Sequence, residues 1–389
     1  MNSRSVRLYI YRTAIPMRRF EHAAASRELA ESVVVRLEFS DGRAGWGQTL
    51  PRSYVTGETI DSVVRDLTEE IWPALTCKEW PAKGKGLPEI PAGDRGRRCI
   101  NAAVCALDIA WIGRLFEYVE DISPEVLTEL TGRARPRREI DVAVSGVLGS
   151  TDPAKTTWRL RLMRFIGLTD FKLKLGLGDE IDSKNLQAVH RQIGRAVRRG
   201  EYTLRVDVNG AWNIDDTPQR VSELKCHDVC VVEQPVFCSA GELVELAQRC
   251  EVPLMADESL LTDADAAALL EEPSKVWWNI RLCKNGGLVR SLRLAHLAVE
   301  NGVSFVAGCM VGESSILSAA QRRFLQLAPA PRFVEGNYGR LLLSADLTTR
   351  SLHFGYAGKL KALRRPALGV VVDPVKVFRY SSLAKVLEA

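Results

Sequence analysis

The sequence has 389 residues, of which 46% are hydrophobic and 26% are charged, a balance typical of globular proteins and unlike that of disordered chains. It contains no apolar run of the roughly 18 residues that a membrane span needs and no signal-peptide core near its start, so we expect a cytoplasmic protein with no membrane partner. The net charge of +5 is mild, and the basic cluster at 133–138 has no interleaved aromatic residues, so we expect no nucleic-acid binding.

The first part of the chain predicts an antiparallel meander followed by helices. Residues 6–12 and 31–39 alternate between polar and apolar side chains, and the Asp41-Gly42 pair before 43–49 is a strong hairpin signal. Helical spacing of apolar residues covers 58–75 and 99–115. We therefore expect an α+β domain over residues 1–135.

A regular alternation of strands and helices follows the Arg- and Pro-rich segment at 132–138. The strand-like runs are residues 140–148, 171–175, 203–208, 229–235, 253–257, 276–282, 304–308 and 332–335. Eight such units favour a (β/α)8 barrel. An open doubly wound sheet is the alternative, but the chain has no Gly-x-Gly-x-x-Gly fingerprint after a first strand.

The regular pattern ends near residue 341. Residues 369–373 predict one more strand, which would return to the N-terminal domain. We therefore divide the chain into an N-terminal domain over 1–135, a barrel over 136–340 and a returning C-terminal segment over 341–389.

Three consecutive barrel strands each end in a carboxylate. These residues are Asp207, Glu233 and Asp257. Adjacent strands lie about 5 Å apart, so the three side chains can converge at the mouth of the barrel, where catalytic groups of this fold are found. Three carboxylates repel one another unless a cation joins them, and oxygen ligands suit Mg²⁺ or Mn²⁺.

A pair of lysines ends the second barrel strand. Lys172 and Lys174 are two residues apart, so both side chains point to the same face. Two adjacent ammonium groups near a dication are expected to lower one another's pKa, and such a lysine can act as a base.

Together these motifs resemble those of the enolase superfamily, and the overall sequence pattern is similar to that of its muconate-lactonizing subgroup. The resemblance rests on Lys172-Leu173-Lys174, Asp207-Val208-Asn209, Glu233-Gln234-Pro235, Asp257-Glu258-Ser259 and Asn285-Gly286-Gly287. It implies an α/β fold: a modified (β/α)7β TIM-like barrel with an α+β capping domain formed by the N-terminal region and the C-terminal tail. It also implies a homo-oligomer, because related barrels often assemble into dimers or octamers.

The resemblance further implies a Mg²⁺-dependent isomerase or lyase of cycloisomerase type that acts on a small carboxylate. Asp207, Glu233 and Asp257 would hold the metal, and Lys174 would abstract the proton α to the carboxylate through a metal-stabilised enediolate. Lys172 would tune Lys174. Asn209 would support the site from behind, and Glu258 would pair with the cation of the sixth strand.

The sixth strand departs from the family pattern. The second catalytic lysine of the family falls on Arg281, and Lys284 lies three residues further on, toward the opposite face or in the loop. Arginine stays protonated and is a poor base. We expect Arg281 to stabilise charge, which disfavours two-base racemisation.

The substrate signals are weaker. The Asp-x-Asp with which similar dipeptide epimerases hold an ammonium group is here Glu335-Gly336-Asn337, so Glu335 could do part of that work. Glu313 could line the site, and Arg18 and Arg19 would favour an anionic substrate end. Two other functions remain open: a dipeptide or N-acyl amino acid epimerase or racemase, and a catalytically silent metal-binding barrel with a binding role.

Overall fold

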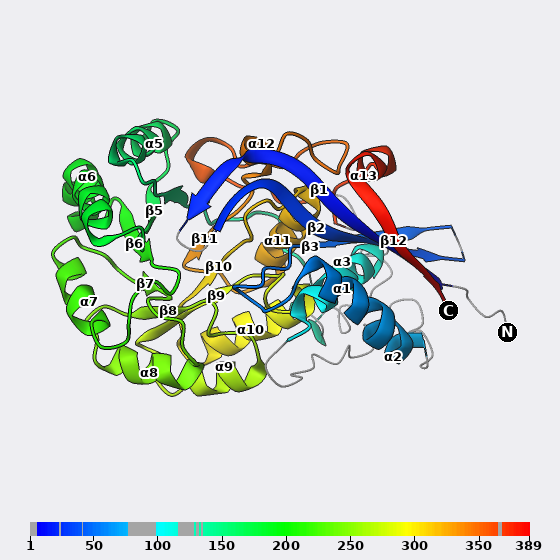
Figure 1. Cartoon of the computed structure of the whole chain (residues 1–389), viewed down its shortest axis with the longest axis horizontal. Helices are drawn as coiled ribbons and strands as arrows, with labels where there is room; N and C mark the ends of the chain where they lie inside the picture. Colours follow the sequence, from blue (N-terminus) through cyan, green and yellow to red (C-terminus); the bar gives the residue numbers. More distant parts are fainter. Residues whose placement is uncertain are drawn as a thin grey trace.

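The computed structural model describes residues 6–22, 25–40, 42–76, 99–115, 128–129, 132–133, 135–364 and 368–389. The described chain forms a curled parallel sheet of eight strands and a separate antiparallel sheet of four strands. Figure 1 shows the two parts side by side, with helices around the outside of the parallel sheet.

The parallel sheet is the predicted barrel. Its strands follow the chain order: β4 (Gly146–Leu148), β5 (Asp170–Lys174), β6 (Thr203–Asp207), β7 (Val232–Glu233), β8 (Leu254–Ala256), β9 (Val276–Ile280), β10 (Phe305–Ala307) and β11 (Phe333–Val334). A parallel bridge between Val144 and Val334 joins its two edges, with Ser145 N donating to Val334 O at 2.8 Å. The predicted fold is confirmed, and all eight predicted runs contain a strand.

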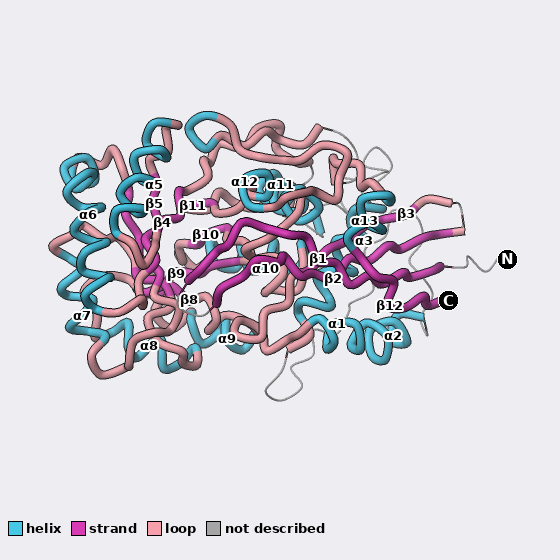
Figure 2. Tube along the Cα trace, turned by 45° about the horizontal axis from the view of Figure 1, so that its top comes forward, coloured by secondary structure: helices cyan, strands magenta, loops and turns pink. Residues whose placement is uncertain are grey.

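Helices connect the barrel strands and cover them on the outside (Figure 2). They are α5 (Pro153–Phe165), α6 (Asp179–Arg198), α7 (Thr217–Lys225), α8 (Ala240–Gln248), α9 (Asp263–Leu269), α10 (Leu288–Glu300) and α11 (Ser315–Leu327). Their starts follow ordinary capping chemistry. Ser239 before α8 and Thr262 before α9, for example, each accept a hydrogen bond from the backbone N–H three residues later.

The antiparallel sheet has the order β12-β1-β2-β3. Its strands are β1 (Val6–His22), β2 (Ala25–Phe39), β3 (Ala44–Thr49) and β12 (Ser381–Glu388). The predicted helical region at 58–75 forms α1 (Ile60–Asp66), the π-helical turn η1 (Leu67–Ile71) and α2 (Trp72–Thr76), and the next helix is α3 (Asn101–Leu115). This sheet and these helices form the cap.

Helix α3 lies between the cap sheet and the barrel and is buried over almost its whole described surface. Its backbone approaches β3 closely: a Cβ on Gly47 would lie 1.8 Å from Ala106 O, so this position needs glycine. On its other side, Asp108 accepts a hydrogen bond of 2.5 Å from Leu288 N at the start of α10. The cap is thus fixed to the barrel through a buried carboxylate.

The β1–β2 hairpin extends from the cap sheet over the mouth of the barrel (Figure 1). Met17 forms an antiparallel bridge with Leu343, just after the short helix α12 (Gly339–Leu342), and Ser344 N donates to Pro16 O at 2.8 Å. One strand therefore belongs to the cap sheet and also brings Arg18 to the edge of the barrel cavity.

The C-terminal segment differs from the prediction in detail. Residues 369–373 form no strand but a single bridge, Thr348 to Val372. After α13 (Pro374–Tyr380) the chain returns to the cap as β12, which pairs antiparallel with β1 from Arg7–Glu388 to Thr13–Ser381. No helix within the described ranges is long and apolar enough to cross a membrane.

Candidate active site

A cavity of about 320 Å³ lies at the carboxyl ends of the barrel strands, beneath the β1–β2 hairpin. The charged side chains that line it are Arg18, Arg159, Lys172, Lys174, Asp207, Glu258, Arg281, Glu313 and Glu335. Tyr54 of the cap and Met163 of α5 add apolar surface. Most of the site residues expected from the sequence therefore share one cavity.

Both lysines of β5 face the carboxylates, as their spacing predicts. Lys172 is buried, and its Nζ lies 2.9 Å from Glu233 Oε2, 2.7 Å from Glu335 Oε2 and 3.3 Å from Asp207 Oδ2. Lys174 Nζ lies 3.2 Å from Asp207 Oδ2 and donates to Asn209 Oδ1 at 2.7 Å. Asn209 therefore touches Lys174 directly.

Without a metal, the surrounding carboxylates decide the pKa of Lys172. Burial alone would lower the pKa of this ammonium, but Glu233, Glu335 and Asp207 outweigh burial and raise it well above its usual range. Three close carboxylates stabilise the charged form more than burial and the Arg281 guanidinium destabilise it. Lys172 is thus a fixed positive charge at the base of the cavity.

The three carboxylates converge as the strand spacing predicts, and two residues that sequence reasoning missed hold them in place. Gln234 Oε1 accepts from Asp257 N at 2.8 Å, which ties the end of β7 to the end of β8. Asn279 Nδ2 donates to Glu233 Oε1 at 2.6 Å. Their positions carried a signal: Gln234 follows Glu233 directly, and Asn279 lies two residues before Arg281 on the same strand face.

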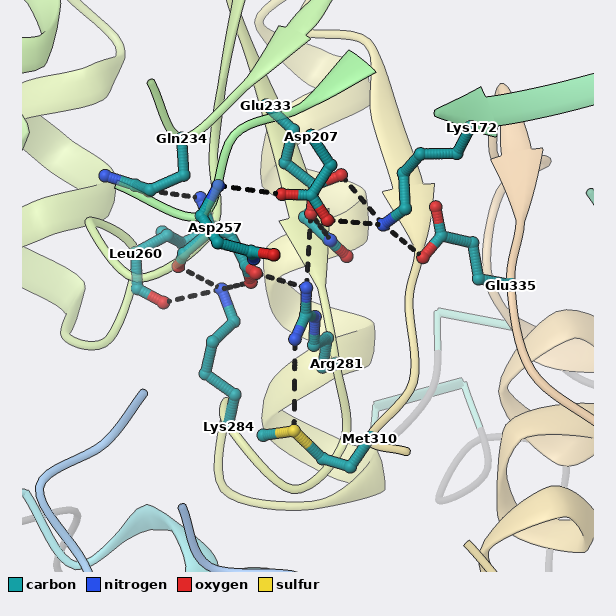
Figure 3. Close-up of polar contacts among 12 residues, drawn as sticks. Lys172, Asp207, Glu233, Gln234, Asp257, Leu260, Arg281, Lys284, Met310 and Glu335 are labelled. Carbon is teal, nitrogen blue, oxygen red and sulfur yellow. Dashed lines mark hydrogen bonds and ion pairs between the residues drawn. The ribbon is translucent and has the colours of Figure 1, made fainter. Parts of the chain in front are cut away.

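Arg281 lies among the carboxylates (Figure 3). Its Nη2 is 3.1 Å from Glu233 Oε1 and also contacts Asp257 Oδ2. Burial would lower the pKa of this guanidinium, but Asp257 and Glu233 raise it above its already high usual value. Arg281 therefore remains a cation, and Gly308 on β10's C-terminal side leaves room for it, since a Cβ there would lie 2.8 Å from Arg281 Cγ.

Lys284 lies in the turn after β9 and is fully buried. Its Nζ donates to Asp257 O at 2.5 Å and to Leu260 O at 3.2 Å, and it lies 3.3 Å from Asp257 Oδ1. These contacts place it behind Asp257 and not among the residues that line the cavity. Lys284 supports the turn that carries the third carboxylate.

Glu335 connects two buried cations. Its Oε2 pairs with Lys172, and its Oε1 lies 3.0 Å from Nη2 of Arg205. The Arg205 guanidinium is fully buried and packs over the Phe333 ring at 4.1 Å. Burial would raise the pKa of Glu335, but Lys172 and Arg205 lower it. Sequence reasoning missed Arg205, whose inward position follows from its place two residues before Asp207.

The remaining expected residues have separate environments. Glu258 was expected to pair with Arg281, but the described residues contain no such ion pair, and its Oε2 has no hydrogen-bond partner among them. Burial, followed by the charge of Asp257, raises the pKa of Glu258 to about 8. Glu313 accepts from Met310 N at 2.7 Å, and burial raises its pKa to about 7. Arg18 and Arg159 are exposed at the cavity edge, whereas the side chain of Arg19 lies outside the described residues. Arg159 was not expected from the sequence.

The donor set fits a divalent cation of the magnesium type. Asp207, Glu233 and Asp257 are fully buried and supply oxygen ligands. Both side-chain oxygens of Asp257 already face cations of the chain, Arg281 at Oδ2 and Lys284 at 3.3 Å from Oδ1, so a metal held here would share Asp257 with them. However, no three acidic, histidine or cysteine side chains in the described ranges stand in a ready-made ligating arrangement.

The comparisons with known proteins agree with this geometry. Residues 159–376 match the family model described as Enolase C-terminal domain-like. The chain is 28% identical over 318 residues to N-succinyl-L-Arg/Lys racemase of Bacillus cereus, covering 80% of this chain and 81% of the relative. It is 28% identical over 322 residues to L-Ala-D/L-Glu epimerase of Bacillus subtilis, covering 81% and 83%.

A third relative is muconate cycloisomerase 1 of Pseudomonas putida, which is 27% identical over 365 residues and covered to 90% in both chains. Among solved structures, N-succinyl Arg/Lys racemase from Bacillus cereus superposes with a TM-score of 0.79 at 24% identity over 99% of each chain. Muconate lactonizing enzyme from Pseudomonas putida superposes with a TM-score of 0.73 at 24% identity, over 96% of this chain and 99% of that one. These superpositions show a shared fold.

Proposed function

Because the chain belongs to the Enolase C-terminal domain-like family, in the mandelate racemase and muconate lactonizing group of the enolase superfamily, we propose that it is an isomerase in which one base moves the proton α to a substrate carboxylate. The chain is an enzyme of this superfamily, whose members use a divalent metal. Lys174 is the base in this proposal, and Arg281 is the charge across the barrel from it.

The proposal rests on the observation that Arg281, and not a second lysine, lies opposite Lys174. Lys174 ends β5, and Arg281 follows β9, four strands away in the closed eight-stranded barrel. A substrate between them presents one face to an amine and the other to a guanidinium. The guanidinium remains protonated, so it can stabilise negative charge on the substrate but cannot remove a proton. Lys284, the other lysine of this region, is bound to backbone carbonyls behind Asp257.

The chain's own residues prepare Lys174 for this role. Asn209 and Asp207 fix its Nζ by contacts of 2.7 and 3.2 Å, and Lys172 adds a buried positive charge on the same strand face. Asp207, Glu233 and Asp257 would hold the metal, which when bound supplies positive charge beside the substrate carboxylate. Apolar side chains, among them Met163 and Leu342, line part of the cavity.

The edge of the cavity favours a substrate with a second anionic group. Arg18 and Arg159 lie there, exposed and positively charged. Glu335 is already paired with two cations, and Asn337 is bound to Arg322 and Gln321, so neither is available to a substrate ammonium group. We therefore propose a substrate with a carboxylate at each end, such as a muconate, to whose α carbon Lys174 would deliver a proton as the lactone ring forms.

The test is α-proton exchange in D₂O with Mg²⁺, followed by NMR and by chiral analysis of the recovered substrate. The panel pairs each N-succinyl amino acid with its N-acetyl analogue, which lacks the second carboxylate, and adds muconates and dipeptides. We expect exchange without inversion, a preference for the dicarboxylates, and a loss of at least about 10³-fold in Lys174→Ala. Inversion at the rate of exchange would reveal a second base and contradict the proposal.

The second candidate function is a dipeptide or N-acyl amino acid epimerase or racemase. The similarity to N-succinyl-L-Arg/Lys racemase and L-Ala-D/L-Glu epimerase is the observation that favours it. Exchange with inversion of a dipeptide or an N-acyl amino acid, lost in Lys174→Ala, would support this candidate against the one-base isomerase.

A further inference from the structure

The guanidinium of Arg281 is placed where a cation would be held by two of the three carboxylates. Its Nη2 lies 3.1 Å from Glu233 Oε1 and contacts Asp257 Oδ2. Glu233 ends β7, and Asp257 follows β8, the strand next to β9 from which Arg281 extends. The side chain is only 11% exposed.

The chain's own cations neutralise each of the three carboxylates. Lys172 and Lys174 lie within 3.3 Å of Asp207 Oδ2, and Lys172 also pairs with Glu233. The third carboxylate, Asp257, has Arg281 on one oxygen and Lys284 at 3.3 Å on the other. Of these cations, Arg281 alone contacts both Glu233 and Asp257 through a single nitrogen atom.

A divalent ion held by Glu233 and Asp257 would need oxygen atoms that this guanidinium contacts. Two like charges at such short range repel one another, and a dication doubles the repulsion that a unit charge would meet. Buried like charges therefore cannot share Glu233 Oε1 and Asp257 Oδ2 without a large loss of free energy. One of the two cations must leave when the other arrives.

The guanidinium of Arg281 has space to move away from the carboxylates. Its other contact is weak, with Nη1 at 3.9 Å from Met310 Sδ, and its Nε has no hydrogen-bond partner in the described part of the chain. Arg281 also lines the cavity of about 320 Å³. The side chain can therefore move from the carboxylates into the cavity, toward the substrate, without breaking a strong bond on that side.

We propose that Arg281 and the divalent metal compete for Glu233 and Asp257, so that Arg281 is a built-in counter-cation of the metal site. The guanidinium holds the carboxylates together at low metal concentration, and metal binding releases it into the substrate cavity. Arg281 thereby sets a low metal affinity and couples metal binding to the arrival of a positive charge beside the substrate. This inference rests on the metal-dependent function proposed above.

The experiment measures Mn²⁺ affinity directly, by calorimetry and by the electron paramagnetic resonance signal of free Mn²⁺. The proteins are the wild type, Arg281→Met, Arg281→Lys and the control Arg159→Met. The control removes the same charge from the same cavity, but Arg159 is exposed and its Nη1 donates to Gly149 O at 3.0 Å. Affinity for Mn²⁺ should rise at least about tenfold in Arg281→Met and change less than about threefold in Arg159→Met.

A second readout follows thermal unfolding in EDTA and in Mn²⁺. Arg281→Met should unfold at a lower temperature than the wild type in EDTA and should gain more from Mn²⁺ than the wild type does, because it has lost its counter-cation. If Arg281→Met does not fold without metal, Arg281→Lys, whose ammonium reaches less far, should still bind Mn²⁺ more tightly than the wild type. Competition is refuted if both Arg281 variants bind Mn²⁺ no more tightly than Arg159→Met.

The failure of this inference and the failure of the proposed function give different results. If the wild type and all variants bind Mn²⁺ equally, the competition is wrong and the metal-dependent function stands. If none of the proteins binds Mn²⁺ at millimolar concentration, the metal-dependent function is wrong, and the competition is overturned with it.

Discussion

The side-chain oxygen of Asn209 accepts a hydrogen bond of 2.7 Å from Nζ of Lys174, and the Asn209 backbone has a left-handed φ of 50°. Asparagine tolerates this conformation better than most residues do. The turn after β6 therefore directs an amide at the lysine that we propose as the base. Asn209 N also donates to Asp207 Oδ1 at 3.2 Å, so one residue connects the lysine to the first carboxylate.

Removal of the Asn209 amide should reduce the rate of α-proton exchange more than substrate binding. Asn209→Gly loses the hydrogen bond without backbone strain, and Asn209→Ala loses it with strain of about 1 kcal/mol or more. We expect kcat to fall about 10- to 100-fold in both variants with little change in KM. A loss confined to Asn209→Ala would mean that strain, and not the hydrogen bond, is responsible.

Glu335→Gln should strongly destabilise the protein. The change leaves Lys172 and Arg205 buried with one anionic partner fewer, and breaking a buried pair costs about 3–5 kcal/mol. The matched control is Glu251→Gln, which breaks an ion pair with Lys225 whose side chains are 54% and 67% exposed and should cost less than about 1 kcal/mol. Urea unfolding measures both. Equal losses would show that the buried pair contributes nothing beyond a surface pair.

The stability of the cap should fall as the pH rises through neutrality. Glu58 accepts hydrogen bonds from Ala102 N at the start of α3, and its burial raises its pKa from 4.5 to about 7 against these bonds. A raised folded-state pKa means that the folded protein holds a proton that the unfolded chain has lost between these two pH values. The protonation of Glu58 therefore adds its full contribution to the free energy of unfolding below about pH 4.5. That contribution, on the order of 3 kcal/mol, is lost by about pH 8.

The comparison of Glu58→Gln with the wild type isolates this effect. Its free energy of unfolding should fall less between pH 5 and pH 8 than that of the wild type. Burial also raises the pKa of Asp108 to about 7. Asp108 should therefore contribute the same pH dependence of the free energy of unfolding in both proteins. The control Asp61→Asn, which changes a carboxylate that is 78% exposed, should leave the slope unchanged. An identical slope in Glu58→Gln would contradict the assignment.

Gly308→Ala should destabilise the protein and disturb the Arg281 side chain. A Cβ at this position would lie 2.1 Å from Asn279 Oδ1 and 2.8 Å from Arg281 Cγ, so both side chains must shift. Such overpacking costs typically about 1–3 kcal/mol. Gly241→Ala in α8 is the control, since its Cβ would meet open space and alanine favours a helix by about 1 kcal/mol. Opposite signs in urea unfolding would support this explanation.

The sequence predicted those features that depend on local periodicity and on strand ends. The eight barrel strands and the meeting of Asp207, Glu233 and Asp257 follow from alternation and from the parallel topology. By contrast, Ser381–Glu388 contains Leu, Ala, Lys and Glu, which favour helices, yet it forms β12 because β1 offers an open edge. Tertiary pairing decides the conformation of such a segment.

Contacts between distant strands could not be predicted in the same way. The sequence identified Lys174 as a neighbour of Lys172, but Glu233 and Glu335, which lie 61 and 163 positions away in sequence, raise the pKa of Lys172. The occupation of Glu233 and Asp257 by Arg281 likewise depends on side-chain length and on the space beside Gly308. Pattern and spacing indicate which residues meet, and geometry decides which charge prevails.

The cap sheet is built from both ends of the chain, with β12 beside β1 and β1 continuing to the cavity edge. Recombination between two relatives with a single crossover near residues 132–138 would therefore pair the β1 of one parent with the β12 of the other. Such a chimera would carry a mismatched sheet even though its barrel came intact from one parent. Exchange of the whole cap, with the β1 segment that carries Arg18, requires two crossovers, one on each side of the barrel. We therefore expect substrate specificity in such proteins to change more readily by point substitution than by exchange of whole caps.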